Sequence, residues 1–191
     1  MSGLWLLDEN GVVRTLLNAH KNGPSLTLFN ERGTTFASLG SSVDGPRLCL
    51  YDETKTIRTA LCVGVVGVFD ENGKPRVALG VDKDVPGVCV RDENGTIRAA
   101  LGTTKSGSGL WLSGENGKDR ITLAATNDGP GLILNDENSL TRAMLSVGTG
   151  GPVLNLSDEN GKPRVGLGVD KKNMPGVFLR DENGKTIWKA P

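Results

Sequence analysis

The tetrapeptide Asp70-Glu71-Asn72-Gly73, or a close variant of it, returns along the chain at a nearly constant spacing. Neighbouring copies begin 22 or 23 residues apart, except for an interval of 18 residues between Asp52 and Asp70. A fixed period of this size is typical of stacked copies of one supersecondary unit. We therefore predict a single repeat array over 1–191, with copies one to three in 1–63 and copies four to nine in 64–191. The remaining copies begin at Asp8, Asn30, Asp92, Gly114, Asp136, Asp158 and Asp181.

Each copy carries the hydrophobic pattern of a β-hairpin. We call the first residue of the tetrapeptide position 0; positions −4 and −2 are then apolar in every copy, as in Val66 and Val68. Position +9 is leucine in all copies but the last, which has Ala190. Alternation of this kind is typical of half-buried strands on either side of a turn. The chain therefore predicts an all-β fold of about nine tandem antiparallel hairpins.

The turn residues predict how the two strands of a hairpin pair. Six copies contain Asn-Gly, which favours a two-residue type I′ turn because both central positions need a positive φ. That turn places Glu71 opposite Lys74, two side chains of opposite charge, and places Leu110 opposite Leu123 on one face of the sheet. The connections between hairpins are rich in Gly, Ser, Thr and Asp, and we expect them to be longer loops.

The second face of the hairpins is also partly apolar. Trp5 and Trp111 occupy position −3, as do Ile133 and Phe178, and we predict that these four residues form a self-association face. Position +6 is usually arginine, and the predicted register sets Arg76 across from Phe69 as a cation–π pair.

Three architectures bury the apolar face of such a sheet. Three chains can pack their leucine faces together as a trimeric β-prism or fibre shaft, and this is the arrangement we favour. Alternatively, one chain can form a β-propeller with two hairpins per blade, or a β-solenoid. The reversing Asn-Gly turns count against parallel solenoid coils, and nine hairpins leave one over after four blades.

Composition and motifs exclude several classes of function. The formal net charge is zero, with acidic and basic residues interleaved, so we expect no nucleic-acid partner. We also expect no membrane span and no signal peptide. The three cysteines argue against a disulfide framework, and a two-residue turn offers too few oxygen ligands for Ca²⁺. The single histidine, His20, has no nucleophile motif near it, so we predict no catalytic site, no cofactor and no metal.

The pattern Gly-x-Leu-x-Leu-x-Asp-x-x-Gly-x-x-Arg-x-x-Leu-Gly runs through the chain, most clearly at 70–102 and 158–168. It resembles β-repeats of uncharacterised bacterial surface and stalk-like proteins and, more loosely, phage tail-fibre shafts. The resemblance implies a place on a cell surface, in an extracellular filament or in a virion. We hypothesise a non-catalytic structural protein that assembles with itself into a homo-oligomer, as a trimer or a filament. The alternative is a lectin-like β-repeat module that binds a glycan or a protein.

Overall fold

The computed structural model describes residues 2–21, 23–42, 45–82 and 85–190. The chain divides into two units, Met1–Gly95 and Thr96–Pro191. All the regular secondary structure in the described residues is β-strand. The first unit contains β1 (Ser2–Leu7), β2 (Val13–His20), β3 (Gly23–Phe29), β4 (Thr35–Ser42), β5 (Gly45–Tyr51), β6 (Ile57–Cys62), β7 (Val65–Phe69), β8 (Pro75–Asp82) and β9 (Val85–Arg91). The second contains β10 (Ile97–Thr104), β11 (Gly107–Ser113), β12 (Asp119–Thr126), β13 (Gly129–Asn135), β14 (Thr141–Gly148), β15 (Gly151–Ser157), β16 (Pro163–Val169), β17 (Pro175–Arg180) and β18 (Thr186–Ala190).

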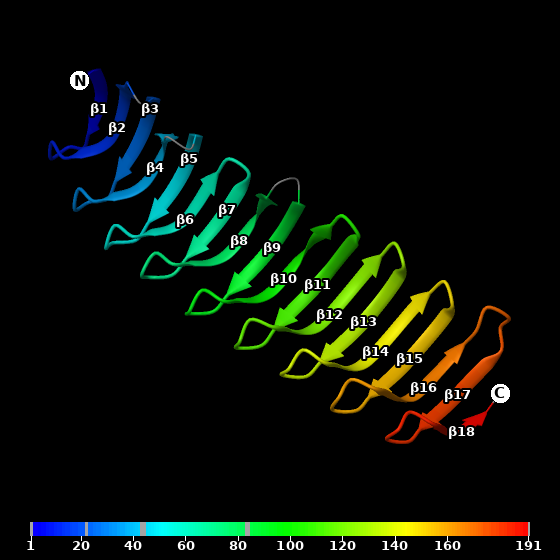
Figure 1. The fold of residues 1–191 in the computed structure, drawn as a ribbon. Helices are drawn as coiled ribbons and strands as arrows, with labels where there is room; N and C mark the ends of the chain where they lie inside the picture. The colour runs from blue at the N-terminus through cyan, green and yellow to red at the C-terminus, as the bar shows by residue number, and fades with distance from the viewer. Residues whose placement is uncertain (1, 22, 43–44, 83–84, 191) are drawn as a thin grey trace. The chain divides into compact units, whose positions relative to one another are not determined.

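Each unit is an open antiparallel meander, in which every strand pairs with its neighbours in the sequence (Figure 1). The prediction of tandem antiparallel hairpins is confirmed. Pairing runs without a break through β1 to β9 and through β10 to β18, so the described strands of either unit form neither four-stranded blades nor parallel coils. The trimeric prism depends on further chains and stays a prediction, as does the single array over 1–191.

The predicted register is confirmed within the strands and wrong at the turn. Leu110 lies opposite Leu123, as expected. At the tip, however, it is Asp70 that pairs with Lys74, its N–H donating to the Lys74 carbonyl at 2.9 Å, and Glu71 lies in the turn. The loop is therefore a three-residue type I turn, in which only Gly73 takes a positive φ of 75°. A β-bulge in the strand that follows the tip takes up the extra residue and restores the predicted register, both in this copy and between β11 and β12.

The short interval between Asp52 and Asp70 is a shorter hairpin inside the first unit. β6 and β7 lose two residues each relative to their counterparts, and Leu61 still lies opposite Val66. Because side chains alternate between faces with a period of two, removing an even number from each strand leaves the apolar residues on the same face.

The connections between hairpins, at the strand ends opposite the tips, are shorter than predicted. The strands continue through the Gly-, Ser- and Thr-rich segments and close in two-residue turns, for example between Thr126 and Gly129. The expectation of longer loops was wrong because the backbone there goes on pairing, which satisfies its N–H and C=O groups.

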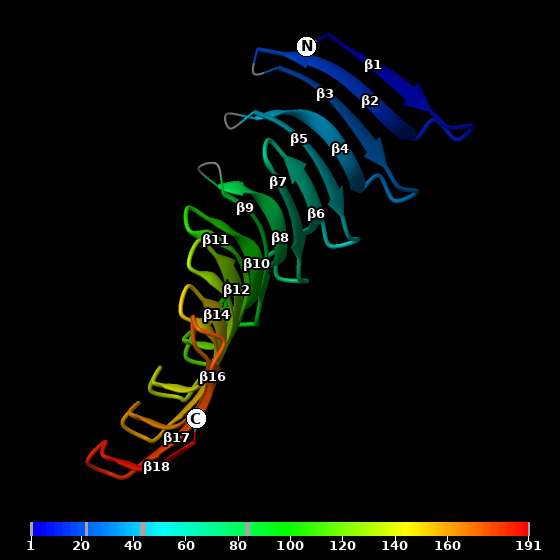
Figure 2. The same ribbon diagram turned by 90° about the vertical axis from the view of Figure 1, so that its right-hand side faces the viewer.

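The described strands of each unit form a single layer (Figures 1 and 2). Only three apolar side chains among the described residues are buried, those of Ala37, Cys49 and Ala60. Cys49 has no exposed surface, whereas most of the leucine side chains are exposed to solvent. Neither unit therefore has the two-layer core that usually buries the apolar face of a sheet.

Candidate functional site

One face of each unit carries an unbroken row of apolar residues, which we call the leucine row. Each residue of the row lies directly opposite the next, on the neighbouring strand. In the first unit the row is Leu4, Leu17, Leu26, Leu39, Leu48, Leu61, Val66, Leu79 and Val88. In the second unit it is Leu101, Leu110, Leu123, Leu132, Leu145, Leu154, Leu167, Val177 and Ala190.

The face that carries the leucine row, the leucine face, is exposed. Leu4 of the row is 60% accessible and Leu110 is 36% accessible, whereas some other members are half-buried: Leu26, Val66, Val88, Leu132 and Val177. The residues that flank the row on the same face are again apolar or small, such as Leu112 and Ile121. The residues paired along this face include no Asp, Glu, Lys or Arg in either unit. A charge-free apolar surface of this extent usually marks an interface.

The predicted self-association residues lie in a second row, on the opposite face. In the second unit the tryptophan row consists of directly opposed residues that include Trp111, Ile133 and Phe178. Trp5 occupies the same repeat position in the first unit, opposite Leu16. The full row of the second unit is Ala100, Trp111, Thr122, Ile133, Met144, Asn155, Gly166, Phe178 and Lys189.

Two of these aromatic rings cover glycines of their own sheet. A Cβ added to Gly166 would lie 2.0 Å from the ring of Phe178, and one added to Gly109 would lie 3.0 Å from the ring of Trp111. Both glycines are buried, so the rings fill the space that missing side chains leave. The guanidinium of Arg180 lies 4.3 Å from the centre of the Phe178 ring, so these two side chains form a cation–π contact. Trp5, by contrast, is 53% exposed.

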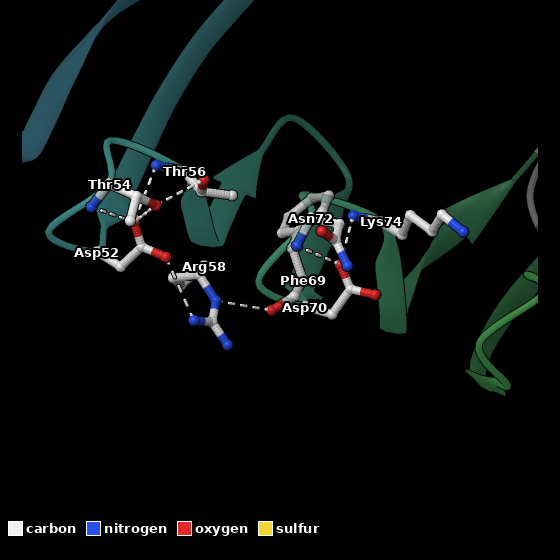
Figure 3. Close-up of polar contacts among 8 residues, drawn as sticks. All are labelled: Asp52, Thr54, Thr56, Arg58, Phe69, Asp70, Asn72 and Lys74. Carbon is white, nitrogen blue, oxygen red and sulfur yellow. Dashed lines mark hydrogen bonds and ion pairs between the residues drawn. The ribbon is translucent and has the colours of Figure 1, made fainter.

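A carboxylate at position 0 anchors seven of the hairpin tips. In the tip of the fourth copy, Oδ1 of Asp70 accepts the backbone N–H groups of Asn72 and Lys74, both at 2.9 Å (Figure 3). Its Oδ2 lies 2.9 Å from Nε of Arg76. The hydrogen bond from the Lys74 N–H is the largest influence on the pKa of Asp70, and together with Asn72 and Arg76 it lowers that pKa despite an opposing desolvation effect.

The same arginine position joins five of the tips to the next hairpin, through Arg58, Arg98, Arg120, Arg142 and Arg164. Nε of Arg58 donates to the carbonyl of Phe69 at 3.1 Å (Figure 3). Nε of Arg142 does the same to Ser157, while its Nη1 lies 3.5 Å from Asp136. The predicted cation–π pair of Arg76 with Phe69 is therefore replaced by an ion pair with Asp70. The signal that was missed is the recurrence of Asp at position 0 with Arg at +6, which brings the two charges together across the bulge.

The described residues hold no cluster of three or more His, Cys, Asp or Glu side chains that could bind a metal ion. Two open hollows of about 490 and 620 Å³ lie on the second unit; the first includes Phe178 and Lys189, and the second includes Ile133 and Met144. In the segments that the structure describes, no helix has the length and hydropathy that a membrane crossing requires.

Searches of protein-family models and of curated proteins find no match to this chain.

Proposed function

We propose that this chain is a non-catalytic structural protein whose repeats associate with further copies of the same chain into a β-rich rod, filament or stalk. The observation that carries the proposal is the leucine face, which is apolar, free of charge and uncovered in each unit. The proposal places the leucine faces of neighbouring chains against one another, as in the trimeric prism predicted from the repeat. It places Trp5 of the first unit, and Trp111, Ile133 and Phe178 of the second, on the outside, for lateral contacts.

The accessible surface supports association. The chain exposes 12999 Å² at a mass of 20.1 kDa. A compact monomer of this mass exposes about 8,700 Å², and two separate compact units of half the mass expose about 10,500 Å² together. The excess over the second figure is about 2,500 Å², whereas each partner in a standard interface buries about 800 Å².

The repeat itself favours a second copy as the partner. Each leucine row repeats at the spacing of neighbouring strands, about 4.8 Å. Another copy of this chain presents the same spacing and the same charge-free surface, so the side chains of two rows can interdigitate along their length. Association of identical surfaces is also the commonest route to soluble oligomers.

Sedimentation velocity on the purified chain tests the proposal, because it measures the mass of the species and its frictional ratio together. We expect a species of about three chains, or a ladder of larger ones. Leu123→Lys, in the leucine row, should convert this species to monomer with unchanged circular dichroism, and Trp111→Glu should remove only the larger species. Lys118→Glu, at an exposed tip, is the matched control. A compact monomer of the unmodified chain at all concentrations would refute the proposal.

The second candidate function is a lectin-like or protein-binding module. The hollow lined by Phe178 and Lys189 favours it, since aromatic and cationic groups beside a glycine floor suit a sugar or a peptide. Glycan and protein screening of the monomeric Leu123→Lys variant tests this candidate, and binding that Phe178→Ala abolishes would support it.

A further inference from the structure

Six hairpin tips contain the same tripeptide, Glu-Asn-Gly, and their asparagines are all exposed. Asparagine before glycine is prone to spontaneous deamidation, because glycine has no side chain to shield the backbone nitrogen that attacks the amide. Since the tripeptides are identical, any difference in rate between the six must arise from the fold. The six asparagines are Asn10, Asn72, Asn94, Asn116, Asn160 and Asn183.

Five of these tips are held by the carboxylate at position 0. In each of them the N–H of the asparagine donates to Oδ1 of the aspartate two residues earlier, at 2.9 to 3.0 Å. The aspartates are Asp8, Asp70, Asp92, Asp158 and Asp181.

The tip of Asn116 is built differently. Its position 0 is Gly114, which has no side chain to offer. Here the N–H of Lys118 donates to Oδ1 of Asn116 itself, at 3.0 Å. A hydrogen bond from the amide two residues on folds the Asn116 side chain back along the Gly117 peptide, and it polarises the carbonyl that the Gly117 nitrogen must attack.

We infer that Asn116 is a site of spontaneous deamidation, and that it reacts faster than the other five asparagines in the folded chain. The Gly117 nitrogen gives its proton to hydroxide and forms a bond to Cγ of Asn116. The bond from Cγ to the side-chain nitrogen breaks, and ammonia leaves with a proton from water. Water then opens the five-membered imide at either carbonyl, which leaves aspartate or isoaspartate.

The reaction changes a contact between neighbouring tips. Nδ2 of Asn116 is 3.5 Å from the carbonyl oxygen of Glu137 in the next tip, and it is the donor of that contact. The product carboxylate has no such donor and adds one negative charge to a chain whose formal net charge is zero. Deamidation therefore replaces an attraction with a repulsion at this pair of tips.

Peptide mapping by mass spectrometry tests the inference on the full chain, incubated in mildly alkaline buffer with and without urea. In the folded chain we expect Asn116 to deamidate about tenfold faster than the other five. This is the change in rate that corresponds to one or two charge-assisted hydrogen bonds, such as those that the aspartates accept in the other five tips. In urea the six rates should converge. Equal rates at the six asparagines in the folded chain, or a faster reaction at one of the other five, would overturn the inference.

Two reciprocal variants assign the effect to position 0. Gly114→Asp supplies the missing anchor, and its new Cβ meets only movable side-chain atoms of Arg120 and Asn116, at 3.3 Å. It should slow Asn116 to the rate of the other sites. Asp70→Gly should raise the rate at Asn72 and leave Asn160 unchanged as the internal control. If Gly114→Asp folds, as circular dichroism reports, and Asn116 still reacts fastest, position 0 does not set the rate and the inference fails.

Discussion

Nε of Arg76 lies 2.9 Å from Oδ2 of Asp70, six residues earlier on the other side of the same hairpin tip. The same carboxylate accepts two backbone N–H groups through Oδ1, so one side chain holds both the turn and the bulge. Asp70→Ala should therefore lower the thermal unfolding midpoint, because two turn donors and the guanidinium lose their acceptor together. Differential scanning calorimetry measures the change, with the neighbouring Glu71→Ala as the control. Equal midpoints for the two variants would contradict the anchoring role.

The anchored tips also predict how stability depends on pH. The pKa of Asp8 is lowered below its ordinary value of 3.8, first by the N–H of Val12, and the pKa of Asp70 is lowered in the same way by Lys74. A carboxyl group with a lowered folded pKa contributes stability that is complete above its unfolded pKa and is lost as the pH falls through the folded pKa. Thermal midpoints should therefore be constant near neutral pH and fall below about pH 4. Asp70→Asn should reduce that fall, and an unchanged acid profile would count against the prediction.

Two tips, at Lys55 and Ser139, take a left-handed backbone without glycine, and the first predicts a stabilising substitution. Lys55 has a φ of 69° at the position where Gly73 has 75° in the next copy. This conformation costs a residue with a Cβ about 1 kcal/mol relative to glycine. Lys55→Gly should therefore raise the free energy of unfolding by roughly this amount in urea titrations, and the reciprocal Gly73→Lys should lower it. A destabilising Lys55→Gly would show that the Lys55 side chain contributes more than the strain costs.

The ring of Phe178 over Gly166 predicts a steric penalty. Because an added Cβ would lie 2.0 Å from the ring, Gly166→Ala must displace Phe178 and with it the contact to Arg180. We expect a loss of about 1–3 kcal/mol, the usual cost of overpacking. Gly150→Ala, where no atom lies within 4 Å of the new Cβ, is the matched control for urea titrations.

The meander predicts that whole repeats can be removed. In each unit the strands contact only their sequence neighbours, so stability should be close to a sum over hairpins and their junctions. Deletion of 114–135 joins Ser113 to Asp136 in the phase of the repeat, and we expect a folded chain with the same circular dichroism per residue. Deletion of 115–135 leaves one extra residue before the tip, which turns the preceding leucines to the other face of the sheet. The unfolding transition of this variant should therefore lose its cooperativity.

The parts of the fold that follow from spacing were predictable, and those that follow from side-chain geometry were not. The alternation around Leu110 and Leu123 determined the strands, their pairing and the face of each leucine. The turn type was wrong because Asn-Gly suits two kinds of turn, and the hydrogen bonds of Asp70 select the one in which only Gly73 is left-handed. Repeat position placed Trp111 and Phe178 correctly in one row. Their covering of glycines depends on ring rotamers, which the sequence pattern does not encode.

The longest interval of the repeat, between Asp158 and Asp181, differs from the others only in the connection of β16 to β17. There Asp170 accepts the N–H of Asn173 on its carbonyl and the N–H of Met174 on Oδ1, and Leu167 still lies opposite Val177. One added residue has thus been absorbed entirely by a three-residue turn, without any shift of the strands. A peptide epitope grafted between Lys171 and Lys172 should accordingly be displayed at this margin of the sheet while both faces keep their composition.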